Sequence, residues 1–363
     1  MMNNQGNQQN APVRQAGVYM PPPASYDNTG AGYAVPATGS DGGGNGTNGG
    51  YQPIDKKILK QCRHKAERRW YRRLVVLNLL IIAAAIGFFL YAFEDTRTYA
   101  EDVYNAVVEE IEDLENAEDV RDADVEKLDD VEKEANDLPD SLLYLLEIVI
   151  TVVAIPFVVY YVYAQYRSMS VCITPKTYPE IYAIVEEYAQ KLGMKKVPKI
   201  YMIQGNGVLN AFSTFIPFKQ YIEIYADLLE VAYREYHDMD TIRFIIAHEI
   251  AHIYYKHATM HYYYAIMFSQ MIPILGSTAS RTREYSCDRL AQLLSGSDGI
   301  DAMMALTAGI HLYKQVDHQD YIEHARTVKG FFIFCWNLVC DHPITTKRVL
   351  ALADPEKKSG KLY

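Results

Sequence analysis

The feature that most constrains this chain is Leu74–Phe93, a run of twenty residues without a charged side chain. A helix of about twenty apolar residues matches the thickness of a bilayer core. A buried helix of a soluble core is the alternative, but a basic cluster precedes the run and an acidic segment follows it. A second apolar run, Leu142–Ala164, contains Pro156, which can kink a helix, and has three tyrosines near its end. Two membrane-spanning helices are therefore expected, at 74–93 and 142–164, with Glu147 at the interface or, alternatively, as a functional carboxylate inside the membrane.

The charges around these runs set the expected orientation. Residues 55–73 form a basic juxtamembrane segment with nine Lys or Arg, whereas Glu94–Asp140 holds twenty Asp or Glu against four Lys or Arg. Because Lys and Arg concentrate on the cytoplasmic side, the N-terminus and the C-terminal part are expected in the cytoplasm. Residues 94–141 are expected outside. We therefore expect an integral membrane protein, in the plasma membrane of a prokaryote.

The segments outside the spans differ in composition. Residues 1–54, rich in Gly, Asn, Gln and Pro, cannot bury enough apolar surface to fold and are expected to be a disordered tail, either purely flexible or contacting a partner. In the acidic loop, apolar residues recur at helical spacing. This predicts a helical hairpin, a helix that self-associates with a neighbouring copy, or a solvated linker.

Charge and cysteine content exclude some classes of protein. The net charge of −10 arises in the acidic loop, and no segment resembles a nucleic-acid-binding module. The five cysteines are irregularly spaced and include no CxxC pair. They predict neither a disulfide framework nor a thiolate zinc site, and Cys287 is expected to be a packed thiol.

Residues 165–363 have the composition of a globular domain. Helical and strand periodicities alternate in its first part, which predicts an α+β fold in which a small sheet packs on helices. The expected elements are a helix at Pro179–Leu192, strands at Pro198–Ile203 and Gln220–Tyr225, a strand or turn at Val208–Phe215, and a helix at Ala226–Tyr236.

The segment Thr241–Met260 contains the sequence His248-Glu249-Ile250-Ala251-His252. Isoleucines at three-to-four spacing predict a helix here, with Asp240 as its cap. Two histidines four residues apart lie on one face of a helix and can bind one zinc ion, while Glu249 can act on a metal-bound water. The alternative is a pair of ordinary packed histidines.

Catalytic zinc normally has three protein ligands, so a third is needed. His257 and His261 are out of register with the known extended histidine pattern and are expected to be surface or packing residues. Glu284 and Asp288, four apart in Arg281–Ala291, share one face of a later helix. Glu284 could bind the metal while Asp288 accepts a hydrogen bond from a ligating histidine. Alternatively, both acids pair only with nearby arginines on a solvated helix.

Four segments in one order resemble the HtpX-type membrane metallopeptidases: Asn210-Ala211-Phe212, the HEIAH sequence, the helix around Glu284, and Asp341–Arg348. These proteins belong to metallopeptidase family forty-eight, which also contains the CAAX prenyl proteases. The resemblance implies a zincin-like domain of the gluzincin type with one Zn²⁺ per chain. The implied roles are zinc ligation by His248, His252 and Glu284, general base catalysis by Glu249, oxyanion binding by His342, support of the acidic residues by Arg348, and substrate binding at Asn210, Ala211 and Phe212.

The chain departs from these relatives after the HExxH sequence, where further spans are common. Tyr262–Leu275 is apolar but only fourteen residues long and contains Pro273. It is expected to be a buried or membrane-resting helix, which argues against a multi-span chamber for prenylated peptides.

These observations predict a membrane-anchored zinc endopeptidase. The resemblance implies misfolded or membrane-associated polypeptides as substrates, as in protein quality control. The first alternative is an inactive protease fold that serves as a membrane scaffold or sensor, against which the intact Glu249 argues. The second is a protease that processes prenylated peptides.

Overall fold

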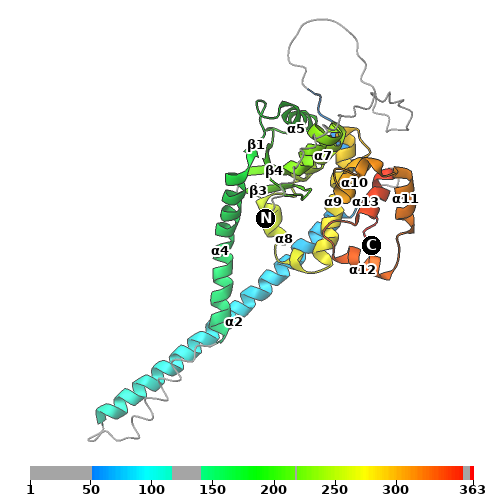
Figure 1. The fold of residues 1–363 in the computed structure, drawn as a ribbon. Coiled ribbons are helices and arrows are strands. Elements are labelled where there is room, and N and C mark those ends of the chain that lie inside the picture. Colours follow the sequence, from blue (N-terminus) through cyan, green and yellow to red (C-terminus); the bar gives the residue numbers. More distant parts are fainter. Residues whose placement is uncertain (1–50, 117–139, 217–218, 355–359) are drawn as a thin grey trace, which may run out of the picture. The chain divides into compact units, whose positions relative to one another are not determined.

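The computed structural model describes residues 51–116, 140–216, 219–354 and 360–363 (Figure 1). Within these ranges the chain is mostly helical and contains one small sheet, which confirms the expected combination of helices with a small sheet. The expected tail up to residue 50 and residues 117–139 of the acidic loop lie outside the described residues. The residues just before the first helix contact α5 (Pro179–Lys191), because the backbone N–H of Ile54 donates a hydrogen bond to the carbonyl oxygen of Lys191 over 2.8 Å.

Two helices are long and apolar enough to cross a membrane (Figure 1). After a short helix α1 (Lys56–Gln61), helix α2 runs from Glu67 to Asn116, and α4 runs from Asp140 to Met169. Their apolar stretches lie within 67–109 and 146–169, and α4 continues through Pro156. Helix α2 therefore begins before the apolar run, inside the basic segment, and extends well beyond it.

A four-stranded mixed sheet has the order β1-β2-β4-β3. Strand β2 pairs in parallel with β4, and the other two pairs are antiparallel. Ile222 and Ile224 of β4 are fully buried against the helices. Strand β3 is an edge strand, so one side of its backbone is open to a further strand. The strands are β1 (Val171–Cys172), β2 (Lys199–Ile203), β3 (Ala211–Ile216) and β4 (Lys219–Tyr225).

Helix α7 (Met239–Tyr254) lies at the centre of the core, in contact with α5, α9, β3 and β4. Its isoleucines and alanines are buried on several sides, because neighbouring elements cover most of its surface. The remaining helical elements are α5 (Pro179–Lys191), α6 (Ala226–Glu230), η1 (Val231–Glu235), α8 (Met260–Ile266), η2 (Ser269–Met271), α9 (Leu275–Ser295), α10 (Ile300–Ala308), η3 (Tyr313–Gln315), α11 (His318–Thr327), α12 (Phe331–Val339) and α13 (Thr345–Ala353).

Several expected boundaries are wrong. The cap of α7 is Asp238, which accepts from the backbone N–H of Thr241, and not Asp240. The helix ends at Tyr254 because the chain turns back at Lys256, whose φ of 66° is left-handed. Tyr262–Leu275 is not one helix: α8 ends at Ile266, a 3₁₀ turn follows, and Pro273 precedes α9. The expected helix at 226–236 is α-helical only to Glu230 and then becomes a π-helical turn.

Candidate metal centre

Helices α7 and α9 supply the candidate ligands. On α7, His248 and His252 are one turn apart on the face toward α9, and on α9 Glu284 and Asp288 are one turn apart on the face toward α7. The two helices approach closely because alanines with small side chains, among them Ala251 and Ala291, are fully buried in the core. Helical periodicity thus places four polar side chains in one buried layer.

The Nε2 atoms of the two histidines and the two carboxylate oxygens of Glu284 lie close together, with Nε2 of His248 nearest to Oε2 and Nε2 of His252 nearest to Oε1. The Nε2 atoms of His248 and His252 are 3.2 Å apart. Each also lies 3.4 Å from one carboxylate oxygen of Glu284. Ligand atoms about 2.0–2.1 Å from a tetrahedral zinc ion are separated by about 3.3–3.4 Å. Two imidazole nitrogens and a carboxylate oxygen also form a donor set that suits zinc, so these residues fit the ion in spacing and in chemistry.

The electrostatics of the site favour a cation. Oε2 of Glu284 is buried and has no hydrogen-bond partner within the described residues. Burial would raise the pKa of Glu284, but His342, His248 and His252 hold it well below its usual range. Burial would likewise lower the pKa of His248, but the neighbouring carboxylates of Asp288 and Glu284 outweigh burial and raise it to about 10. The site therefore stabilises positive charge where the ring nitrogens meet, and a divalent cation would satisfy the orphaned oxygen.

Asp288 and Arg348 fix the orientation of His248. Nδ1 of His248 lies 2.9 Å from Oδ1 of Asp288, an arrangement that leaves Nε2 with its lone pair free for a metal. Arg348, on α13, donates from Nε to Oδ2 of Asp288 over 2.9 Å. A second guanidinium nitrogen lies 3.8 Å from Glu284. Burial would raise the pKa of Asp288, but Arg348 and His248 lower it, so the carboxylate stays charged.

A cavity of about 240 Å³ opens beside these ligands. Glu249 lies in its wall, as do Asn210 and Ala211 at the start of the edge strand β3. The complete lining consists of Leu209, Asn210, Ala211, Leu228, Phe244, Ile245, His248, Glu249, Glu284, Met303, Leu306, His342 and Arg348. The lining of the cavity thus combines acidic and imidazole groups with apolar side chains.

The other residues expected at the substrate have different surroundings. His342 is 68% exposed, and its Nε2 lies 3.5 Å from Glu284, so it sits at the mouth of the cavity. Phe212 does not line the cavity. Its ring contacts Tyr166 and Tyr225 edge-on, on the side of the sheet toward α4.

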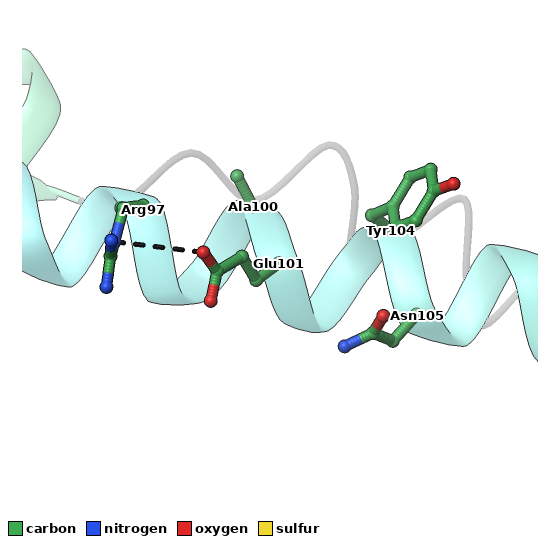
Figure 2. Close-up of a pocket in the computed structure, with 5 residues that line it drawn as sticks. All are labelled: Arg97, Ala100, Glu101, Tyr104 and Asn105. Atoms are coloured by element: carbon green, nitrogen blue, oxygen red, sulfur yellow. Dashed lines mark ion pairs between the residues drawn. The ribbon is translucent and has the colours of Figure 1, made fainter.

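A second hollow lies on the outer part of α2 (Figure 2). It is lined by Arg97, Ala100, Glu101, Tyr104 and Asn105, and Nε of Arg97 lies 3.7 Å from Oε1 of Glu101. All five side chains come from one helix and include a single, ion-paired carboxylate. This hollow offers no ligand set comparable to that of α7 and α9.

Two histidines flank the α7 ligands. His261 is exposed, as expected of a surface residue, whereas His257 is buried and its Nδ1 lies 3.2 Å from Nδ1 of His252. Cys287 is fully buried, and burial raises the pKa of its thiol well above the usual range, as expected of a packed thiol. The contact of His257 with a candidate ligand was not predicted, because the helix ends between them.

The fold and the ligand set define a zinc metallopeptidase of the HExxH-plus-glutamate kind. Residues 175–276 match the model of Peptidase family M48, so the chain carries a domain of this family, as its motifs predicted. The matched segment includes both histidines and Glu249 and ends before Glu284, which the structure adds to the cluster. Comparison with curated proteins and with solved structures gave no match.

Proposed function

We propose that this protein is a membrane-anchored zinc endopeptidase that cleaves extended segments of misfolded or membrane-associated polypeptides. The observation that carries the proposal is the cluster of His248, His252 and Glu284, because His248 and Glu284 line a cavity together with Glu249. A bound zinc ion would supply Lewis acidity, which polarises the scissile carbonyl and lowers the pKa of an attacking water.

The chain's own residues then have distinct tasks. Glu249 accepts a proton from the water as its oxygen bonds to the carbonyl carbon, and it passes that proton to the amine as the C–N bond breaks. His342, at the cavity mouth, donates a hydrogen bond to the carbonyl oxygen as negative charge develops there. Asp288 and Arg348 hold His248 in place throughout.

The edge strand supports the proposed class of substrate. An extended peptide can pair with the open edge of β3 near Asn210 and Ala211, through main-chain hydrogen bonds that read no particular sequence. A folded domain cannot present such a segment, whereas a misfolded chain can. The apolar lining residues Leu228, Phe244 and Met303 favour an apolar side chain next to the scissile bond.

The two long apolar helices support membrane attachment. We propose that α2 and α4 both cross the membrane, with the peptidase domain on the cytoplasmic side. The family's link to membranes supports the attachment. The basic cluster before the apolar part of α2 supports the orientation. The boundaries expected from the sequence place the peptidase domain at 165–363.

Removal of the metal tests the proposed function. The purified full chain in detergent should cleave an unfolded, fluorescently labelled protein, lose this activity in a chelator, and regain it with about one zinc ion per chain. Cleavage that persists in the chelator after zinc has been removed would contradict the proposal. Bound zinc without any cleavage would point to a scaffold, and cleavage only of prenylated peptides would point to a processing protease.

A further inference from the structure

His252 is held by a chain of side chains that leads away from the cavity. Its Nδ1 lies 3.2 Å from Nδ1 of His257. The other ring nitrogen of His257, Nε2, lies 3.1 Å from Oε1 of Glu67. Both residues are deeply buried, with His257 and Glu67 8% and 4% exposed. This series of side chains therefore runs from a candidate metal ligand, through the protein interior, to the first turn of α2.

Only one arrangement of protons on His252 and His257 lets these side chains hydrogen-bond to one another and to Glu67 when a metal is bound. His252 must offer the lone pair of Nε2 to the metal, so its Nδ1 carries a proton. That proton is donated to Nδ1 of His257, whose own proton then resides on Nε2. Nε2–H in turn donates to the carboxylate of Glu67. These three side chains form a relay, and among them each nitrogen has one role and each proton one acceptor. Nδ1 of His257 also lies 3.8 Å from Sγ of the buried Cys287.

Glu67 is itself fixed in its charged form. Arg63 lies 2.9 Å from Oε1, and the hydroxyl of Ser286 on α9 bonds to Oε2. The backbone N–H of His64 donates to the same hydroxyl over 2.9 Å, which closes the cluster around the start of α2. Because an anion is stabilised at a helix N-terminus, Glu67 is suited to hold the distant end of the relay.

The turn after α7 brings His257 into this position. Lys256 adopts a left-handed backbone, and the N–H of His257 donates to the carbonyl of His252 over 2.9 Å. This fold-back places the two rings edge-to-face, with centroids 5.2 Å apart. A regular continuation of α7 would have placed residue 257 on another face of the helix.

We propose that His257 and Glu67 are positioning residues of the metal centre, which orient His252 and thereby join the start of α2 to the zinc site. This inference rests on the proposed zinc site. It deepens that proposal, because the relay makes the segment before the first candidate span a part of the peptidase centre. Residues that orient a metal-binding histidine typically change metal affinity about 10- to 100-fold when they are removed.

Zinc affinity of the full chain in detergent tests the relay. The dissociation constant would be measured by competition with a chromophoric chelator. His257→Phe removes both ring nitrogens, and with them the contacts to His252 and Glu67, and should weaken zinc binding about 10- to 100-fold. His257→Gln retains an acceptor and a donor and should restore most of that loss. Glu67→Gln should weaken binding in the same direction by less, because its amide oxygen still accepts from His257.

The matched control is Glu187→Gln. Glu187 is also a buried glutamate with ionic partners, and it bonds to α7 through Arg243, but it contacts no candidate ligand. The unfolding temperature of each metal-free variant would be measured alongside. A merely structural role predicts lower stability with unchanged zinc affinity, which is the result expected for Glu187→Gln alone.

The outcomes separate the relay from the proposed function. Wild-type protein that binds no zinc would overturn the proposed function and the relay with it. Zinc-binding wild type with unchanged affinity in His257→Phe would overturn the relay alone, and so would a Gln variant as weak as the Phe variant. If His257→Phe does not fold, a zinc affinity of Glu67→Gln equal to that of Glu187→Gln would contradict the relay. The ligand atoms of His252, His257 and Cys287 also lie close enough together to hold a metal ion. Two metal ions per chain, one of them lost in Cys287→Ser, would therefore contradict the relay, because His257 would then bind metal instead of accepting a proton.

Discussion

At the scale of single residues, Glu223 on β4 is an unusual buried acid. Its side chain is fully buried, and neither carboxyl oxygen has a hydrogen-bond partner in the part of the chain that the structure describes. Burial raises its pKa to about 7, although the positive charge of Arg167 acts in the opposite direction. The folded protein therefore keeps a proton on Glu223 that an unfolded chain would release near its ordinary pKa of about 4.3.

Glu223→Gln should consequently change how stability depends on pH. Between the unfolded and folded pKa values the folded state binds more protons, so wild-type stability falls as pH rises from about 4.5 to 7 and then levels off. The glutamine variant has no carboxyl group at this position and therefore lacks this fall in stability. Its free energy of unfolding relative to wild type should rise by about 1–3 kcal/mol between pH 5 and pH 8. Denaturant unfolding at both pH values measures this change, and a pH-independent difference would contradict it.

The residues around the metal differ in how readily the sequence reveals them. His248 with His252, and Glu284 with Asp288, are pairs within single helices, where a spacing of four residues fixes a common face. Glu67 and His257 lie 190 residues apart. Their contact depends on the left-handed backbone of Lys256 and on the docking of α2, which no local pattern encodes. Glu67 also lies among the nine Lys and Arg residues of the basic segment, so the charge pattern does not indicate a functional acid there.

At the scale of elements, Glu187 fastens α5 to the metal helix α7. One nitrogen of Arg243 lies 2.8 and 2.7 Å from its two carboxylate oxygens, and Lys191 lies 2.6 Å from one of them. Burial would raise the pKa of Glu187, but Lys191 and Arg243 outweigh burial and lower it. The ionised carboxylate thus stabilises the packing of the two helices.

Glu187→Gln should lower the free energy of unfolding by about 1–2 kcal/mol at neutral pH. The effect is moderate because the side chains of Lys191 and Arg243 remain 25% exposed, and solvent screens the ion pairs. Because the folded pKa is depressed, this contribution is present above the unfolded pKa and is lost as pH falls through the folded value. Denaturant midpoints of both proteins should therefore converge below about pH 4, and a gap that widens there would count against this account.

The sequence predicted which segments are helices or strands more accurately than it predicted where they begin and end. The strands at 199–203 and 219–225 and the helices α5 and α7 have clear periodicities, because each buries one face or is covered on most sides. The ends depend on individual turns. Asp238 caps α7 because it also contacts Tyr313 and Lys314, from a part of the chain more than seventy residues away. Likewise, the break before α9 requires Ile274 at a φ of 70°, which an apolar run does not suggest.

At the scale of the whole molecule, α2 is much longer than a bilayer is thick. Its 50 residues span about 75 Å, against about 30 Å of hydrocarbon. The sequence predicted the apolar middle of this helix as a span and, separately, helical spacing in the acidic segment, the first part of which lies in α2. Near its start, Asn78 accepts from the backbone of Phe268 and Ser269, so the N-terminal turns of α2 dock on the peptidase domain. The acidic end of the helix extends beyond the apolar run on the other side.

The proposed topology predicts opposite labelling of two exposed positions. A cysteine introduced at Asp102, beyond the apolar part of α2, should react with a membrane-impermeant maleimide in intact cells. A cysteine at Lys176, at the start of the peptidase domain, should react only after the cells are permeabilised. The unsubstituted chain gives the background from its native cysteines. The reverse pattern would place the peptidase domain outside the cell.

The central claim is that Glu249 acts on water at a zinc ion held by α7 and α9. The most direct measurement compares cleavage of an unfolded protein by the full chain and by its Glu249→Gln variant, with zinc content determined in both. The account predicts equal zinc, because Glu249 is not a ligand, and a loss of cleavage of about 100-fold or more in the variant. Equal cleavage rates in two zinc-loaded proteins would contradict it.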